Sequence, residues 1–160
     1  MKMMKRNPDA LVRIRRWLPP PVILLIFIAG DLLTTNPHFV IASVSRLLSL
    51  AIATVSLCFI LFTAWQMHSH KTTLNPLHAD RTTTLVTRGC YRLSRNPIYL
   101  GMSGLQLATA IYCGSLPGAM ALPIFMLAVA RLHIDFEEAQ LRLRFGQDWD
   151  RYAQRVRRWL

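Results

Sequence analysis

Acidic residues are scarce in this 160-residue sequence, which has 8 Asp and Glu against 19 Lys and Arg and a formal net charge of +11. In nucleic-acid-binding proteins such a surplus lines a polar domain. Here the basic residues flank apolar stretches instead, which is typical of the cytoplasmic ends of membrane helices. The charge pattern therefore argues against nucleic acid and indicates a negatively charged lipid surface as the partner.

Cysteine is also scarce, since Cys58, Cys90 and Cys113 are far apart and odd in number. That spacing excludes a disulfide framework and a cysteine zinc site. His68 and His70 lie near His78, but no second clear pair of ligands accompanies them, so we interpret them as solvated loop histidines and assign no metal.

Hydrophobic residues are abundant, at 52% of the chain, which is more than a soluble domain of this length usually carries. We therefore expect an all-α fold with a single membrane domain over residues 1–160. About four apolar runs have lengths near the roughly 20 residues that cross a bilayer. They lie at 18–33, 39–65, 97–115 and 117–134. The first two crossings fall within 18–67, and the last two form a helical hairpin over 97–134.

The basic segments predict how the chain is oriented. Lys and Arg are concentrated in the N-terminus (1–17), the central loop (68–96) and the tail (135–160). Cytoplasmic segments carry this excess, and four crossings place all three segments on that side. We expect a multi-pass protein with both termini in the cytoplasm. The expected location is a prokaryotic plasma (inner) membrane, with the endoplasmic reticulum as the eukaryotic alternative.

The tail has apolar residues at spacings of three and four, with arginines between them. This pattern predicts an amphipathic helix that lies on the lipid headgroups and is broken near Gly146.

The hairpin geometry predicts a polar site. Its arms, 97–115 and 117–135, have equal lengths. At about 1.5 Å per residue each is roughly 27 Å long, close to the roughly 30 Å of the hydrocarbon core. Arg95–Asn96 and Glu137–Glu138 are therefore expected to meet at the cytoplasmic boundary.

Asn96 followed by Pro97 is a typical helix start, with free backbone N–H groups that favour a carboxylate or phosphate. Structural capping is the simpler explanation of Asn96 and Pro97, and surface ion pairing is the simpler explanation of Arg95 with the two glutamates.

Three strings in the second half carry a family resemblance. They are Leu-Val-Thr-Arg-Gly-Cys-Tyr-Arg at 85–92, Arg-Asn-Pro-Ile-Tyr-Leu-Gly at 95–101, and Glu-Glu at 137–138 with Phe-Gly at 145–146. From about residue 73 to 159 the chain resembles the isoprenylcysteine carboxyl methyltransferase and phospholipid methyltransferase superfamily of integral membrane enzymes.

The resemblance implies a methyltransferase that uses S-adenosylmethionine and acts on a lipophilic or amphiphilic acceptor entering from the bilayer. The cofactor would lie at the cytoplasmic face, between the last two membrane helices and the tail. The implied cofactor-binding residues are Tyr91, Asn96, Pro97, Tyr99, Leu100, Gly101, Glu137 and Glu138. Arg95 would orient the acceptor, and Arg95 and Glu138 are the implied catalytic residues.

The acceptor and the oligomeric state stay open. The isoprenylcysteine enzymes have His at the position of Asn96. Some phospholipid methyltransferases have Asn there, as this chain does. The nucleophile on the hydrophobic body is therefore a carboxylate, an amine, a thiol or a phenol.

Two alternatives to a methyltransferase remain. Membrane sterol-type reductases end in a similar pattern and use NADPH, but they are longer, and the chain has no Gly-x-Gly-x-x-Gly loop. The other alternative is a non-catalytic four-helix membrane subunit whose charged residues form interfacial ion pairs.

Overall fold

The computed structural model describes residues 14–15, 17–35, 43–69 and 84–160, and within these ranges the chain is helical, with no strand. The elements are α2 (Pro20–Leu33), α3 (Ser43–Ser69), the 3-10 turn η2 (Gly89–Arg92), α4 (Pro97–Tyr112), α5 (Leu116–Val129), the π-turn η3 (Ala130–Ile134), α6 (Asp135–Phe145) and α7 (Gln147–Arg155). The expected all-α fold is confirmed for this part of the chain.

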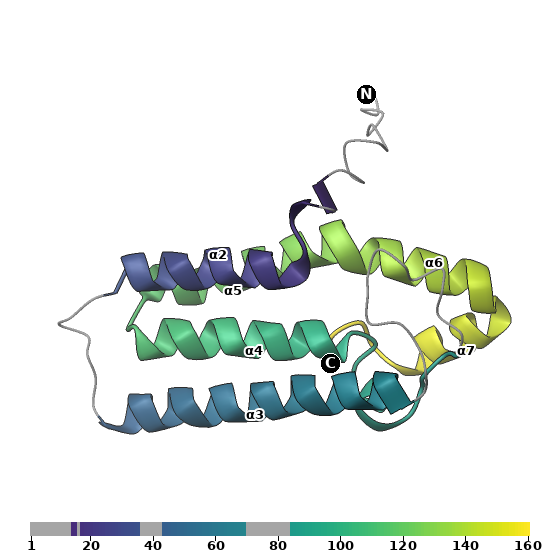
Figure 1. Ribbon diagram of the computed structural model, residues 1–160, viewed down its shortest axis with the longest axis horizontal. Helices are drawn as coiled ribbons and strands as arrows, with labels where there is room; N and C mark the ends of the chain where they lie inside the picture. Colours follow the sequence, from purple (N-terminus) through teal and green to yellow (C-terminus); the bar gives the residue numbers. More distant parts are fainter. Residues whose placement is uncertain (1–13, 16, 36–42, 70–83) are drawn as a thin grey trace.

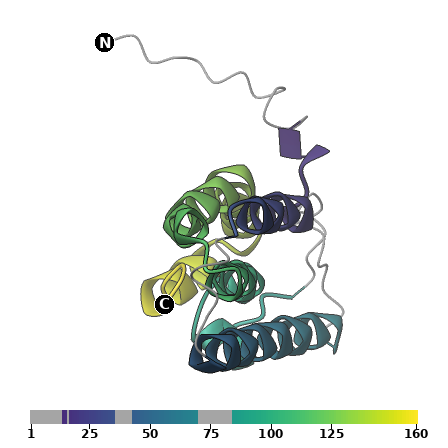
Figure 2. The same cartoon turned by 90° about the vertical axis from the view of Figure 1, so that its left-hand side faces the viewer.

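Helices α2 to α5 lie side by side, with α4 between α3 and the pair formed by α2 and α5 (Figures 1 and 2). Consecutive helices run in opposite directions. The starts of α2 and α4 and the ends of α3 and α5 therefore lie at the same end of the bundle, which also carries α6 and α7 (Figure 1). We call this the α6 end.

The core of the bundle is made by α2, α4 and α5. Phe125, Val129 and Ile134 are fully buried and pack with Ile23 and Tyr99. The rings of Phe27 and Phe125 meet edge to face, with centroids 5.3 Å apart. This packing fixes α5, and the helix that continues from it, against the start of α4.

Two helices are long and apolar enough to cross a membrane, Ser45–Ser69 and Leu116–Phe145, and Pro20–Leu33 is a shorter apolar helix. Their outer faces carry many exposed large apolar side chains, among them Leu25, Leu47, Leu61, Met120 and Ile124. An apolar surface of this extent marks a membrane or protein contact. The structure therefore supports membrane association, whereas the count of four crossings stays a prediction.

The last long helix differs from its expected bounds. We expected a membrane arm ending at 134 and a separate tail from 135, but α5, η3 and α6 form one continuous helix to Phe145. Within η3 the backbone N–H of Asp135 bonds to the oxygen of Ala130, five residues back. The helix changes its hydrogen-bond register here and does not end, because no residue in this stretch breaks it.

The predicted break at Gly146 is present, with φ at +50°, a conformation that favours glycine. After it, α7 turns back toward the bundle, and the C-terminus lies beside the start of α4 (Figure 1). Trp149 and Tyr152 are buried. These two tail residues pack against protein, so the headgroup contact predicted for the tail does not extend to them.

Candidate functional site

The start of α4 and the acidic turn of α6 meet at the α6 end. Arg95 Nη2 lies 3.5 Å from Glu138 Oε1, and Asn96 Nδ2 donates to the same oxygen at 3.3 Å. Both side chains of the Arg95–Glu138 pair are largely shielded from solvent, at 16% and 13% exposure. The meeting of the two hairpin ends, predicted from their equal lengths, is confirmed.

Arg158 completes this cluster and was missed by the sequence analysis. Its Nη2 donates to Glu138 Oε2 at 2.6 Å, and its Nη1 donates to Asp135 Oδ1 at 2.8 Å. Glu138 therefore bridges two arginines, one from the segment before α4 and one from the segment after α7. In the sequence Arg158 is one of many tail arginines, and no spacing distinguishes it from the others.

The last residues of the chain are tied to the segment before α4. The backbone N–H of Arg95 donates to the oxygen of Arg157 at 3.0 Å. The oxygen of Arg158 accepts from Ser94 Oγ at 3.0 Å and from Asn96 Nδ2 at 3.2 Å. Asn96 occupies the N-cap position as predicted, but its side chain makes no capping bond. Its amide joins the tail to Glu138 instead.

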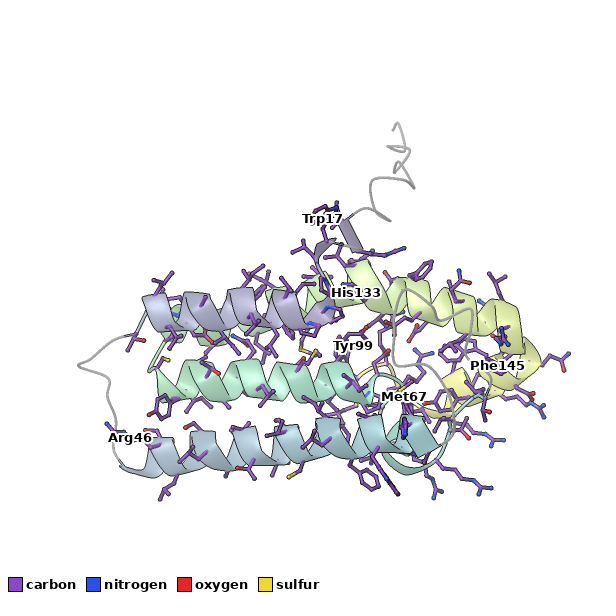
Figure 3. All side chains as sticks on the ribbon, in the orientation of Figure 1. Trp17, Arg46, Met67, Tyr99, His133 and Phe145 are labelled. Carbon is purple, nitrogen blue, oxygen red and sulfur yellow. The ribbon has the colours of Figure 1, made fainter. Side chains whose placement is uncertain are left out.

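Glu137 bonds to a different group, Tyr99 of α4, whose hydroxyl donates to its Oε1. Burial raises the pKa of Glu137 to about 7, against the lowering effect of the Tyr99 bond, and the neighbouring Glu138 raises it further. Burial also raises the pKa of Tyr91 in η2. The Tyr91 backbone oxygen accepts from the Tyr152 hydroxyl at 2.8 Å, which attaches η2 to α7. Figure 3 shows Tyr99 at the α6 end, below His133.

A cavity of about 490 Å³, lined by both charged and apolar side chains, lies between α6 and α7, next to Glu138. Its lining includes Arg95, Asp135, Glu138, Arg142, Trp149 and Asp150. The Arg95 guanidinium carbon is 5.7 Å from the Trp149 ring centroid. Arg95 Nε is buried and has no hydrogen-bond partner among the described residues. An unpaired buried donor is costly, so this nitrogen is suited to an anionic group of a ligand.

The remaining predicted residues lie in the first turns of α4. Pro97 is buried and Leu100 is partly buried. Gly101 packs against α3, where an added Cβ would come within 2.5 Å of Ile60 Cγ1 and 3.1 Å of the Ser56 backbone oxygen. Helix packing therefore accounts for a glycine here, and a role for Gly101 at the cofactor stays a prediction.

The fold and this cluster define a helical, membrane-associated protein with a charged site at one end of its bundle. A model of the family described as phospholipid methyltransferase matches residues 44–148. The chain belongs to this family. The match includes every site residue predicted from the sequence, whereas α2 and Arg158 lie outside it.

Three proteins are similar in sequence to part of this chain. An uncharacterized protein of Haemophilus influenzae is 35% identical over 63 residues, which are 39% of this chain and all of that protein. Probable protein-S-isoprenylcysteine O-methyltransferases of Oryza sativa subsp. indica and subsp. japonica are each 30% identical over 80 residues, half of this chain. The similarity spans 42% of the rice proteins' length. No solved structure matches the chain.

The comparisons support a methyltransferase of the phospholipid and isoprenylcysteine type. They do not favour the sterol-type reductase or the non-catalytic subunit. A family of this type implies a methyl donor.

Proposed function

We propose that this protein is a membrane-embedded methyltransferase that takes its methyl group from S-adenosylmethionine and transfers it to a lipophilic or amphiphilic acceptor. The observation that carries the proposal is the junction of Arg95, Asn96 and Glu138 beside this cavity, in a chain of a methyltransferase family. The proposed site lies at the cytoplasmic surface.

The groups around the cavity suit the chemistry of this cofactor. Its ammonium, sulfonium and ribose hydroxyls match the carboxylates of Asp135 and Glu138, which line the cavity, and that of Glu137, the residue before Glu138. Its carboxylate matches the unpaired Nε of Arg95. The Trp149 ring provides an apolar wall against which an adenine base can stack. The cavity volume of about 490 Å³ falls within the range typical of small-molecule sites.

When bound, S-adenosylmethionine would supply an electrophilic methyl carbon, with the neutral thioether S-adenosylhomocysteine as the leaving group. Arg95 and Asn96 hold Glu138 at the start of α4. Of the three acidic side chains of α6, Glu137 is the one that is held by the Tyr99 hydroxyl and not by an arginine, which suits it to face a cation. The protein thus aligns the reactants and excludes water, and no covalent enzyme intermediate is required.

We further propose that four helices cross the bilayer and that both termini are cytoplasmic. Helices α2 and α4 have 14 and 16 residues. At about 1.5 Å per residue they are roughly 21 and 24 Å long. Such short helices are accommodated by local thinning of the bilayer. The basic flanks agree with the positive-inside rule, and a prokaryotic inner membrane remains the proposed location.

The acceptor is proposed to reach the site from the lipid, because the outer faces of α2, α3 and α5 are apolar. Its nucleophile is a carboxylate, amine, thiol or phenol. Asn96 does not select among these, because its amide contacts Glu138 and the Arg158 backbone within the protein.

Calorimetric titration of the detergent-purified protein with S-adenosylhomocysteine tests the proposal, with NADPH as the alternative ligand. Saturable binding of the first ligand is expected to be lost in the Glu137→Ala/Glu138→Ala variant. Asp148→Ala, which removes an exposed carboxylate of α7, is the matched control and should bind normally. Binding of NADPH alone would favour the reductase. Binding of neither ligand would favour the non-catalytic subunit.

A further inference from the structure

The segment before α2 contacts the π-turn η3, although more than a hundred residues separate them. Arg15 Nε donates to the backbone oxygen of Leu132 at 2.5 Å. The guanidinium carbon of Arg15 also lies 4.5 Å from the ring centroid of Phe136, within the range of a cation–π interaction. One arginine therefore bonds to both η3 and the first turn of α6.

A second contact joins the same two parts of the chain. The His133 ring nitrogen Nε2 lies 2.9 Å from the backbone oxygen of Leu18. His133 is almost fully buried, with 1% exposure. Figure 3 shows Trp17 directly above His133 where the helix passes from α5 to α6. Two side chains thus attach the segment before α2 to η3. Arg15 comes from that segment, and His133 comes from η3.

The geometry of η3 decides where the site carboxylates point. A π-turn adds one residue to a helix, and each residue of an α-helix advances the direction of the side chains by about 100°. Glu137 and Glu138 follow η3 directly. With the extra residue in place, Glu137 meets Tyr99 and Glu138 meets Arg95. A return to regular α-helical bonding would turn both carboxylates away from these partners.

We propose that Arg15 is a positioning residue that holds η3 in its π-turn and so aims Glu137 and Glu138 into the site. Arg15 lies outside residues 44–148, which match the family, whereas both carboxylates lie within them. The N-terminal segment therefore orders the family's site from outside it. The effect on cofactor binding rests on the proposed function, but the effect on η3 does not.

Two measurements on the full-length protein test this role. The first is amide hydrogen exchange over residues 133–139. The second is the affinity for S-adenosylhomocysteine. Arg15→Ala should speed exchange there and weaken binding by about tenfold, because the carboxylates are misplaced and not removed. Arg15→Lys keeps a cation and a donor and should recover most of both effects. Phe136→Leu should change both measurements in the same direction by less.

Arg131→Ala is the matched control, because it removes an exposed arginine from η3 itself. It should leave exchange and affinity at wild-type values. Unchanged amide exchange in Arg15→Ala would overturn the proposal. Faster exchange together with wild-type affinity would also overturn it. So would a loss of affinity in Arg131→Ala equal to that in Arg15→Ala. If the wild type fails to bind S-adenosylhomocysteine, the proposed function fails. The exchange data then decide by themselves whether Arg15 holds η3.

Discussion

Arg158 and Glu138 are joined by an ion pair of 2.6 Å, and the same guanidinium reaches Asp135 at 2.8 Å. These contacts attach the end of the chain to the first turn of α6. Glu138 also faces Arg95 across 3.5 Å. The carboxylate therefore connects α6 to the start of α4 on one side and to the C-terminal residues on the other.

Replacing Arg158 with alanine should loosen the tail and weaken cofactor binding. Glu138 and Asp135 lose their shortest charged hydrogen bonds, each of which stabilises the fold by about 1–3 kcal/mol. Because Arg158 is 35% exposed, we expect a total loss near the lower end of that range. Thermal unfolding and titration with S-adenosylhomocysteine measure the two effects. Arg157→Ala is the control, since the Arg157 side chain is exposed and only its backbone contacts Arg95. An equal loss in this variant would argue against a specific role for Arg158.

The stability of the protein should depend on pH through Glu137. Its pKa of about 7 in the folded protein exceeds the 4.5 of an ordinary glutamate. The folded state therefore binds this proton more tightly than the unfolded state does. The resulting stabilisation is complete below about pH 4.5 and is lost as the pH rises through about 7. Comparing Tm between pH 5 and 8 should show a decline in the wild type that is smaller in Glu137→Gln. The exposed carboxylate variant Asp148→Asn should keep the wild-type slope, and a parallel slope in Glu137→Gln would contradict the assignment.

The meeting of Arg95 and Glu138 could be predicted because it needs only two helical arms of equal length and a tight turn between them. Ser115 makes that turn, where its side chain accepts from the Gly118 N–H at 2.9 Å. The part of the site that could be predicted therefore follows from the rise per residue of a helix and from the hydrophobic pattern that marks the two helical arms. The family resemblance placed Tyr99 and Glu137 in that same region, and the structure pairs them.

The contribution of Arg158 could not be predicted in this way. Beyond Arg155 the chain leaves the helix, and the contacts of a non-helical segment depend on tertiary packing and not on periodicity. The π-turn η3 is similar, because it contains no proline or glycine and nothing else in its sequence marks a change of register. Gly101 shows a limit of prediction from a motif. A motif assigned it to the cofactor, and that role stays a prediction, because contact with α3 by itself also favours a glycine here.

Gly101 offers a direct test of packing against cofactor binding. Gly101→Ala should lower the free energy of unfolding by about 1–3 kcal/mol, because the new methyl group overpacks the contact with Ile60. The double variant Gly101→Ala/Ile60→Ala should recover part of this loss, since the closest atom is then removed. Thermal unfolding in detergent provides the measurement. A double variant that regains stability but does not bind S-adenosylhomocysteine would instead place Gly101 at the cofactor.

The number of membrane crossings can be decided by labelling single cysteines with a membrane-impermeant maleimide, after Cys58, Cys90 and Cys113 have been replaced. Thr35→Cys and Leu116→Cys lie at the end of the bundle opposite the α6 end, whereas Arg88→Cys and Arg155→Cys lie at the α6 end. With four crossings the first two label in intact cells, and the last two label only after permeabilisation.

Two crossings, by α3 and the α5–α6 helix alone, give a different pattern. Position 35 would then share a side with 155, and position 116 would share a side with 88, because α4 would no longer carry the chain across the bilayer. The two topologies thus differ in which positions label under the same conditions, and this does not depend on which side is the cytoplasm. We call two such positions paired. Pairing of 35 with 116 supports the four-helix topology. Pairing of 35 with 155 would contradict it and would place the charged site outside a membrane-spanning hairpin.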